Sequence, residues 1–385
     1  MNIHSYRNLF PITENKVYLS NSASTPASTR QVDAMARFFQ DWAMQGRECV
    51  DYYMDQAEEA RGTVADLIGA DCEEVAFVSN TSMGLNAVAQ GLKLGPGDAV
   101  LVPVPDFPAN VFAWKNLEQD GVRIVEVPKR EDGRFGVEEL EKSLVPGARV
   151  VALSSVDFVT GFAADLKAIG SFCREKGLLF CVDAIQGLGV LPLDVRECGI
   201  HFLSSGTYKW LLGQRGAALL YVSEEADHLV SLPWAGWRTM AVDGWELHFS
   251  PKKGARRLEP GSLDIMGALA AKAGLDIIAE AGMAGIHTRI MDLTDMVKAE
   301  LDSRSLEVVS PWGPGNVPAL FPFLWTIRTR SCGILPHARF TAPPGWVWCA
   351  SRRTSTTTRP TSRRSSMPWT GRCNGRGTKT VIIIE

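Results

Sequence analysis

The stretch Val182–Leu212, VDAIQGLGVLPLDVRECGIHFLSSGTYKWLL, indicates the fold of this chain. Asp183 stands where a buried strand would end, and Gln186 follows it. A second apolar run, His201–Leu203, leads into the polar sequence SSGTYK, which ends at Lys209. Short apolar runs that each end in polar residues are typical of an open α/β sheet, in which ligands bind at the carboxyl ends of the strands.

The same pattern extends along the chain from residue 74. Seven short, mostly apolar, β-rich runs occur, namely Glu74–Ser79, Ala99–Val104, Arg123–Val127, Arg149–Ser154, Leu178–Asp183, His201–Leu203 and Ala217–Val222. Helical or loop segments separate most of them, such as Met83–Leu92, Val111–Gln119, Val137–Ser143 and Lys167–Lys176. Strands that alternate with helices predict an α/β fold with a mainly parallel seven-stranded sheet sandwiched by helices.

Other helices are expected outside this region, at Thr29–Phe39, Gln56–Ile68, Ser262–Ala281 and Ile286–Leu301. The Ala-rich helix Ser262–Ala281 is a bridge from a large domain, residues 1–265, to a small C-terminal α/β domain, residues 266–385. Near the N-terminus, Asn15–Ser28 predicts a short strand followed by small polar residues. These polar residues form either a plain loop or a loop that lines a substrate pocket.

Composition places the chain among ordinary globular proteins. It has 385 residues, 45% hydrophobic and 22% charged, with a formal net charge of -3, which gives no argument for nucleic acid or an anionic membrane as a partner. The N-terminal residues lack the pattern of a signal peptide, and no apolar run approaches the ~20 residues of a membrane span. None of the 8 cysteines forms a CxxC pair, so we expect reduced thiols, no metal site and a cytoplasmic location.

Polar residues follow several of the predicted strands directly. Thr81 and Ser82 open a helix, where hydroxyls and free N–H groups suit a phosphate, although a simple helix cap explains them equally well. Phe107 follows the second strand and either stacks on a planar ring or belongs to the core. Asp183 is either a site acid or a turn cap, and Lys209 either a site base or a solvated charge. Their coincidence on successive strand ends favours one shared site.

A lysine and an acid placed in this way suit imine chemistry. A partly desolvated lysine amine is a nucleophile that forms a Schiff base with an aldehyde cofactor. An acid keeps the pyridine nitrogen of such a cofactor protonated, so that its ring accepts electrons. We therefore predict Lys209 and Asp183 as the catalytic residues.

These residues resemble the class V aminotransferase family of fold-type I enzymes that depend on pyridoxal 5'-phosphate (PLP). The resemblance covers roughly residues 17–301 and is most specific in Asp183-x-x-Gln186 and in the Ser-Gly-x-Tyr-Lys sequence that ends at Lys209. It implies that Lys209 carries the Schiff base, that Asp183 pairs with the pyridinium nitrogen, and that Gln186 bonds the phenolic oxygen.

The resemblance also implies the remaining cofactor contacts. Phe107 is expected to stack on the ring. Thr81, Ser82 and Tyr208 are expected to hold the phosphate, with help from Ser205. Ser262 matches a position that reaches the phosphate of the neighbouring subunit, which implies a homodimer with shared active sites.

Several reactions are compatible with this resemblance. Phe107 and Tyr208 occur in kynureninase-like members, whereas cysteine desulfurases have histidines there, so an aminotransferase, an epimerase or a kynureninase-like lyase acting on a small-molecule amino acid is expected. The alternative is a cysteine desulfurase or selenocysteine lyase, which needs a nucleophilic cysteine such as Cys332 or Cys349 in the C-terminal part. A non-catalytic binding protein that retains the fold is a further alternative. A dinucleotide-dependent oxidoreductase is disfavoured because no Gly-x-Gly-x-x-Gly turn follows the first strand.

The C-terminal part departs from the rest of the chain. Val308–Ile384 contains no Asp or Glu, although the whole chain has 43 acids and a stretch of this length would hold about eight of them. One interpretation is a disordered basic tail. The interpretation we favour is a reading-frame change near Leu324, which would leave residues 324–385 out of frame. Translation in the shifted frame with G+C-rich codons resembles the end of the family, including an arginine for the substrate carboxylate that the given sequence lacks.

Overall fold

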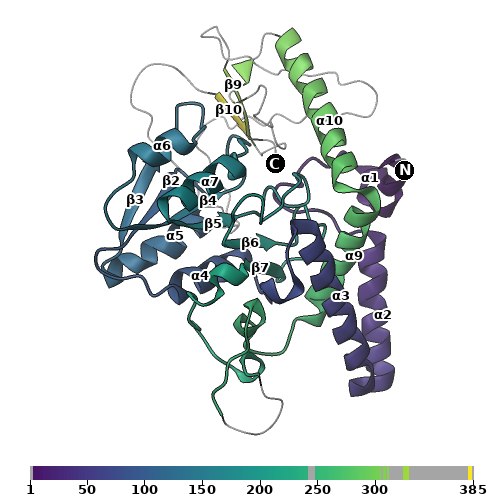
Figure 1. Cartoon of the computed structure of the whole chain (residues 1–385). Coiled ribbons are helices and arrows are strands. Elements are labelled where there is room, and N and C mark those ends of the chain that lie inside the picture. The colour runs from purple at the N-terminus through teal and green to yellow at the C-terminus, as the bar shows by residue number, and fades with distance from the viewer. Residues whose placement is uncertain are drawn as a thin grey trace, which may run out of the picture.

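The computed structural model describes residues 3–241, 248–304, 307–308, 310–311, 324–328 and 380–383. A seven-stranded sheet lies at its centre, with helices on both sides (Figure 1). The strand order is β1-β7-β6-β5-β4-β2-β3. The strands are β1 (Val75–Val78), β2 (Ala99–Val104), β3 (Arg123–Pro128), β4 (Ala148–Ser154), β5 (Leu179–Asp183), β6 (Phe202–Gly206) and β7 (Ala218–Val222).

The sheet is mainly parallel, as the sequence predicts. Strands β3, β2, β4, β5 and β6 pair in parallel along the sheet. Strand β7 is antiparallel to both of its neighbours, so β1 at the edge runs in the same direction as β6. The carboxyl ends of six strands therefore meet at one edge of the sheet, and the polar residues that follow them gather there.

Helices cover both faces of the sheet. They are α1 (Ile12–Asn15), α2 (Thr29–Gln45), α3 (Val50–Ile68), α4 (Thr81–Gly91), α5 (Pro108–Lys115), α6 (Val137–Lys142), α7 (Leu166–Lys176), α8 (Glu224–Asp227), α9 (Ile265–Ala281) and α10 (Met283–Ser303). Apolar residues of α4 and α5 pack on one face of the sheet. Apolar residues of α3, α6, α7 and α9 pack on the other. Two hydrophobic cores thus enclose the strands, which explains their continuous apolar sequences.

Two helices near the N-terminus are longer than the sequence predicts. Helix α2 starts at the capping box of Ser28 and continues beyond Phe39 as far as Gln45, where Gly46 adopts a φ of 58° and ends it. Helix α3 begins at Val50 rather than Gln56. The additional turns carry exposed residues with a weaker apolar period, so the pattern alone underestimates them.

The predicted short strand at the start of Asn15–Ser28 is wrong. Residues 16–20 have no regular structure, and α1 ends at Asn15. The segment does not pair with a strand because its backbone bonds elsewhere: Thr25 N donates to Tyr208 O at 2.9 Å. The segment therefore lies across the carboxyl edge of the sheet instead of extending it.

The described part of the C-terminal region holds α10 and a three-stranded antiparallel sheet in the order β10-β9-β8. Its strands are β8 (Glu307–Val308), β9 (Leu324–Arg328) and β10 (Thr380–Ile383). Most of the segment for which we predict a frame change, including Cys332 and Cys349, lies outside the described residues. Within the described residues, no helix has the length and apolar character needed to cross a membrane. In the same part of the chain, no group of three or more His, Cys, Asp or Glu residues is placed to hold a metal ion.

Candidate active site

Asp183 lies at the carboxyl edge of the sheet. It is the last residue of β5, aligned with Ser154 of β4 and Ser204 of β6, and its side chain is buried. The carboxylate accepts a hydrogen bond from Ile185 N at 3.0 Å. This short turn after the strand holds the carboxylate at the strand end, where the sequence predicts a site acid.

Lys209 lies in the turn that follows β6 and is 8% exposed. Thr25 holds this turn from the N-terminal segment, because its backbone N donates to Tyr208 O and its Oγ1 donates to Lys209 O at 2.6 Å. The segment Asn15–Ser28 thus contacts the backbone of the predicted catalytic lysine. Of the two interpretations of its polar residues, this contact favours the pocket-lining loop.

Burial changes the pKa values of both residues toward their neutral forms. Desolvation raises the pKa of Asp183 to about 7, Asp106 adds to the rise, and Lys209 opposes it. Desolvation lowers the pKa of Lys209, while the charge of Asp183 acts in the opposite direction. The amine is therefore more often unprotonated than a surface lysine, as a nucleophile must be.

Two aromatic rings lie beside the lysine. Phe107 precedes α5 and is 44% exposed, and its ring centroid is 5.9 Å from Lys209 Nζ. Phe158 packs edge-on against Phe107, with ring centroids 5.4 Å apart. Phe158 was not assigned a role from the sequence, although it follows β4 much as Phe107 follows β2.

Asp106 is a buried acid that the sequence-based site omits. Its Oδ2 accepts hydrogen bonds from Ser154 Oγ at 2.9 Å and Asn110 Nδ2 at 2.9 Å, and its Oδ1 accepts from Phe107 N at 2.7 Å. Asp106 therefore fixes the start of α5 and the backbone of Phe107. Its position after a strand is the same signal that singled out Asp183.

Tyr208 lies between two cations. Its ring centroid is 5.8 Å from Lys209 Nζ and 4.8 Å from Cζ of Arg215. Arg215 is exposed and lowers the pKa of Lys209 by its charge. The sequence-based site does not include Arg215. The only available signal is its place in the polar turn between β6 and β7.

The N-terminus of α4 brings Thr81 into the same region. Thr81 is 6% exposed, and its Oγ1 has no hydrogen-bond partner among the described residues. Ser82 follows it and is half-buried. Gly206 faces this helix start closely, since a Cβ on it would lie 3.3 Å from Thr81 Oγ1 and 3.0 Å from Cε1 of Tyr208. A buried hydroxyl without a partner at the positive end of a helix suits an anion.

Gln186 is held by two contacts. Its Oε1 accepts from Trp210 Nε1 at 2.9 Å, and its Nε2 donates to Ser22 O at 3.1 Å. One amide hydrogen of Gln186 remains available for a ligand.

Two predicted cofactor residues lie apart from this group. Ser205 is fully buried and follows Leu203 on the opposite face of β6 from Ser204, and its Oγ donates to Gly206 O at 3.4 Å. Ser262 is exposed and lines a pocket of about 420 Å³ together with Ser79 and Met83. The structure thus gathers Asp183, Lys209, Phe107, Tyr208 and Thr81, but not Ser205 or Ser262.

Solved structures share this fold. An apo structure of the cysteine desulfurase from Thermococcus onnurineus NA1 matches with a TM-score of 0.75 and 24% sequence identity, covering 85% of this chain and 82% of that one. The likeness shows a fold-type I sheet with its flanking helices, as predicted from the sequence.

Sequence comparisons identify the family. The Aminotransferase class-V family model matches residues 17–314. A probable cysteine desulfurase of Methanothermobacter thermautotrophicus is 30% identical over 331 residues, which cover 84% of this chain and 81% of the relative. An uncharacterized aminotransferase, YcbU, of Bacillus subtilis is 26% identical over 341 residues, covering 88% and 90%. The chain belongs to the class-V aminotransferase family. It is an enzyme with PLP as its cofactor, as the sequence predicts.

The described residues fit this cofactor. The Thr81 hydroxyl at the start of α4, which has no partner among the described residues, suits the phosphate, and a Cβ at Gly206 would crowd it at 3.3 Å. Lys209 is buried with a lowered pKa. The carboxylate of Asp183 is also buried, and the charges of the two residues affect each other's pKa. An aldehyde, a basic ring nitrogen and a phosphate are the three groups that such residues bind.

Proposed function

We propose that the enzyme acts at the α-carbon of an amino acid, with Lys209 as the attachment point of the cofactor and as the base that moves the α-proton. The aminotransferase, epimerase and kynureninase-like lyase reactions share this step. The observation that carries the proposal is the buried lysine beside a buried acid, each with its pKa displaced toward the neutral form. When bound, PLP supplies an aldehyde for the amine and a ring that accepts electrons.

Each neighbouring residue has a role in this proposal. Asp183 holds a proton at the ring nitrogen, and its burial excludes water from that contact. Phe107 covers one face of the ring with an apolar surface. Gln186 donates its remaining amide hydrogen to the phenolic oxygen. The phosphate is bound by Thr81, Ser82 and Tyr208.

Lys209 alternates between two protonation states. Its lowered pKa provides the neutral amine that accepts a proton from the α-carbon, and the resulting ammonium returns that proton to a product carbon. The tether from Thr25 to the lysine backbone keeps the amine in position while its charge changes.

Cysteine desulfuration is the second candidate, and the similarity to a probable desulfurase favours it. That reaction needs a reactive thiol at the site. Among the described cysteines, Cys72 and Cys198 precede the amino ends of β1 and β6, on the opposite edge of the sheet. Cys173 and Cys181 lie in the hydrophobic core, where burial raises their pKa values and suppresses the thiolate. Cys49 is buried in a cluster with Phe38 and Tyr53. Cys332 and Cys349, the thiols expected for desulfuration, lie outside the described residues, so the product assay distinguishes the two candidates.

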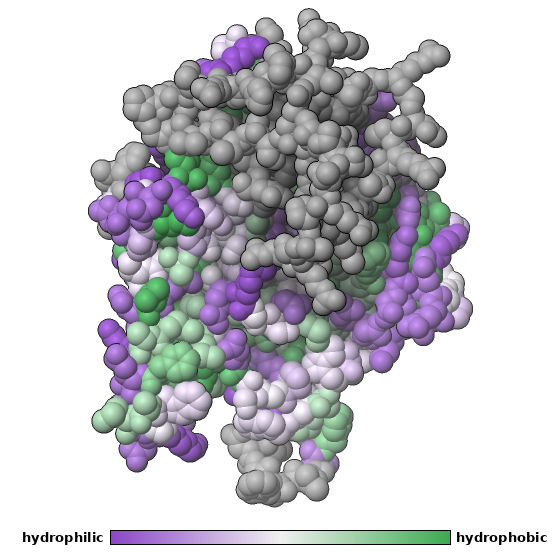
Figure 2. Space-filling view, turned by 180° about the vertical axis from the view of Figure 1, so that it is seen from behind, coloured by the Kyte–Doolittle hydropathy of each residue, from purple (hydrophilic) through white to green (hydrophobic). Residues whose placement is uncertain are grey.

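A homodimer belongs to the proposal, with Ser262 of a second copy at the phosphate. Exposed apolar side chains support it: Val32 and Phe39 along α2, and Trp42, Met44 and Tyr52 around the end of α2 and the start of α3. Figure 2 shows apolar surface at the lower left, over the end of this helix pair. Exposed apolar patches of this kind mark interaction surfaces. We further propose a cytoplasmic location and a chain without nucleic-acid partners.

A frame change near Leu324 remains part of the proposal. The absence of acids in Val308–Ile384 supports it, and the family match ends at residue 314. Only the small domain, residues 266–385, would then be changed by the corrected frame. Resequencing of the gene tests this, because an in-frame read that reproduces the given residues removes the idea.

A cofactor and product assay tests the function. Purified protein mixed with PLP should turn yellow, and borohydride should fix the cofactor to a peptide that contains Lys209. A screen of amino acids with separate detection of keto acid, inverted amino acid, alanine and sulfide then distinguishes the reactions. A colourless protein that takes up no PLP contradicts the proposal, and sulfide as the only product selects the second candidate.

A further inference from the structure

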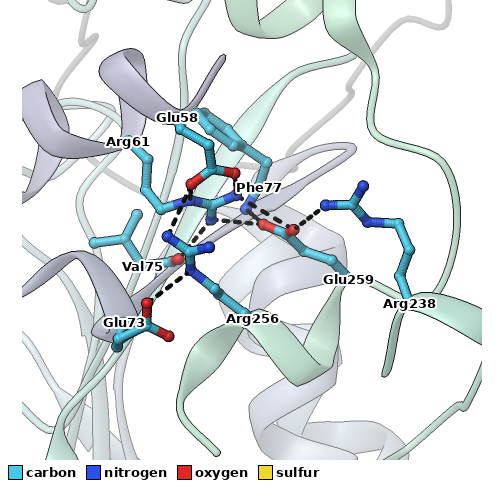
Figure 3. A network of polar contacts seen from close by, with 8 residues as sticks. All are labelled: Glu58, Arg61, Glu73, Val75, Phe77, Arg238, Arg256 and Glu259. Carbon is cyan, nitrogen blue, oxygen red and sulfur yellow. Dashed lines mark hydrogen bonds and ion pairs between the residues drawn. The ribbon is translucent and has the colours of Figure 1, made fainter. Parts of the chain in front are cut away.

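A buried cluster of charges lies at the free edge of β1. Arg61 of α3 is fully buried, and its Nη1 donates to Glu259 Oε1 at 2.7 Å. Glu58 binds the other side of the guanidinium, with Arg61 Nε donating to its Oε2 at 3.0 Å. Two further arginines bind these acids: Arg238 lies 3.7 Å from Glu259, and Arg256 lies 2.8 Å from Glu58. Figure 3 shows the side chains of Arg61 and Glu259 directed toward each other at the centre of this network.

The Arg61–Glu259 pair satisfies the unpaired backbone of an edge strand. Among the strands that the structure describes, β1 pairs only with β7, so one side of its backbone has no partner strand there. Arg61 Nη1 donates to Val75 O at 2.7 Å, and Phe77 N donates to Glu259 Oε1 at 2.7 Å. The two side chains thus replace a neighbouring strand at this edge.

The backbone of β1 and the loop after Glu259, which this pair joins, each lead to a predicted phosphate ligand. Phe77 lies in the strand that leads directly to Thr81, whose buried hydroxyl has no partner among the described residues. Glu259 opens the loop that ends at Ser262. Ser79 and Ser262 line the same pocket of about 420 Å³. One ion pair therefore joins the start of α4 to the Ser262 loop.

The Ser262 loop also packs closely against a second segment, opposite the Arg61–Glu259 pair. A Cβ on Gly236 would lie 2.0 Å from Pro260 O, so the Trp234–Arg238 segment packs closely against the loop. Arg238 N also donates to Pro260 O at 3.4 Å. The loop is thus held between this segment and the Arg61–Glu259 pair.

We propose that the Arg61–Glu259 pair is a positioning element for cofactor phosphate, because it sets the Thr81 turn and the Ser262 loop at a fixed relative position. This inference rests on the proposed function, in which the Thr81 turn binds the phosphate in its own copy and the Ser262 loop reaches the phosphate of the second copy. Neither Arg61 nor Glu259 touches the cofactor. They act through the segments that they join.

The test compares PLP with pyridoxal, which has the aldehyde and ring but lacks the phosphate. Apo protein is titrated with each compound, and both dissociation constants are measured from the yellow absorbance band well below the unfolding temperature. In the variant Glu259→Ala, Arg61 keeps Glu58 as a partner. We expect the preference for PLP over pyridoxal to fall at least about tenfold, since only the phosphate contacts depend on the loop.

Controls separate positioning from general loss of structure. Glu280→Ala on α9 removes an exposed ion pair with Arg30 of α2 and should leave the preference for PLP over pyridoxal unchanged. Arg61→Lys, which keeps the charge but not the forked contact, serves if Glu259→Ala does not fold, and should lower the preference in the same direction.

The outcomes differ clearly. Equal weakening of both compounds in Glu259→Ala or Arg61→Lys, or unchanged binding of both, overturns the inference and assigns the pair a purely structural role. If the wild-type protein binds neither compound, the proposed function itself fails. If the wild type prefers PLP and the variants retain that preference, only the positioning role is lost.

Discussion

Two buried acid–base pairs in this enzyme differ in how completely their polar atoms are satisfied. Arg61 and Glu259 have hydrogen-bond partners on every side, including two backbone groups of β1. Among the described residues, Asp183 accepts one hydrogen bond, from Ile185 N, and Lys209 Nζ forms no ion pair within 4 Å. Both pairs are buried.

The two pairs have different roles because their buried polar atoms differ in the number of hydrogen-bond partners. Full pairing keeps Arg61 charged, and the pKa of Arg61 is raised by Glu259 and Glu58 against the opposing effect of burial. Incomplete pairing leaves Asp183 and Lys209 with pKa values shifted toward their neutral forms. A pair whose polar atoms all have hydrogen-bond partners, which we call the saturated pair (Arg61–Glu259), fixes backbone positions. A pair with few such partners, the unsaturated pair (Asp183 and Lys209), can still bind a ligand and exchange protons with it.

Removal of the lysine should produce the largest effect. Lys209→Ala should lower kcat/KM by about 1,000-fold or more, since both the attachment point and the proton carrier are lost. Borohydride should no longer fix the cofactor, as checked by mass spectrometry. Lys142→Ala on the exposed surface of α6 is the matched control and should behave as wild type. Retention of the fixed cofactor in Lys209→Ala would contradict the assignment.

Loss of the acid should have the next largest effect. Asp183→Asn preserves size but cannot hold a charged ring nitrogen, so kcat should fall about 100-fold or more while the protein still binds PLP. Steady-state kinetics and cofactor titration check this. A variant with wild-type kcat would show that the ring nitrogen does not depend on Asp183.

Loss of the Arg61–Glu259 pair should affect the stability of the fold more than catalysis. Arg61→Met leaves Glu259 buried without its main partner and should lower the free energy of unfolding by about 3–5 kcal/mol. Glu280→Gln at the exposed Arg30–Glu280 pair should change it by about 0–1 kcal/mol. Urea denaturation of the apo proteins measures both. Similar small losses in the two variants would remove the distinction between the buried and the exposed pair.

The unsaturated pair should make apo stability depend on pH. The pKa of Asp183 is raised to about 7 in the folded protein, above the value of about 3.9 in an unfolded chain. The folded state therefore binds the proton more tightly, and its stability decreases as the pH rises through this window. Unfolding temperatures of wild type and Asp183→Asn, measured from pH 4 to 8, should diverge as the wild type loses stability. Parallel curves would contradict the shifted pKa.

The smallest effect should come from the tether of the lysine turn. Thr25→Val removes the hydrogen bond from Oγ1 to Lys209 O but keeps the backbone bond to Tyr208 O. One such bond contributes about 1 kcal/mol, so kcat should fall roughly fivefold. A change confined to KM would place Thr25 at substrate binding rather than at the lysine.

The sheet was largely predictable from the sequence. The bounds of β2, Ala99–Val104, agree residue for residue, because a strand buried on both faces needs a continuous apolar run. The predicted end of β6 at Leu203 was too early, since the strand continues to Gly206 through buried serines that resemble a loop. That difference also explains why Ser205 lies apart from the site. Within a strand its side chain points to the face opposite Ser204, which a predicted loop does not indicate.

The site was predictable only in part. Thr81, Phe107, Asp183 and Lys209 stand out because each follows a strand directly, and position after a strand is a local property of the sequence. Asp106 has the same signal but was treated only as part of a turn. Arg215 has no local signal beyond its place in a polar turn, because its approach to Tyr208 depends on how the turn before β7 folds back.

The sequence by itself determined the layered α/β fold, the cofactor and the pairing of an acid with a lysine at strand ends. The fold and the placement of the acid and the lysine follow from hydrophobic periodicity and from residues that stand next to strands in the chain, and the cofactor follows from the resemblance of these residues to the class V aminotransferase family. Only the tertiary structure decided that Arg61 meets Glu259, 198 residues away, and that Thr25 holds Lys209, 184 residues away. The reason is physical: periodicity records which face of an element is buried, whereas the partner of a buried polar group depends on which distant segment packs against it.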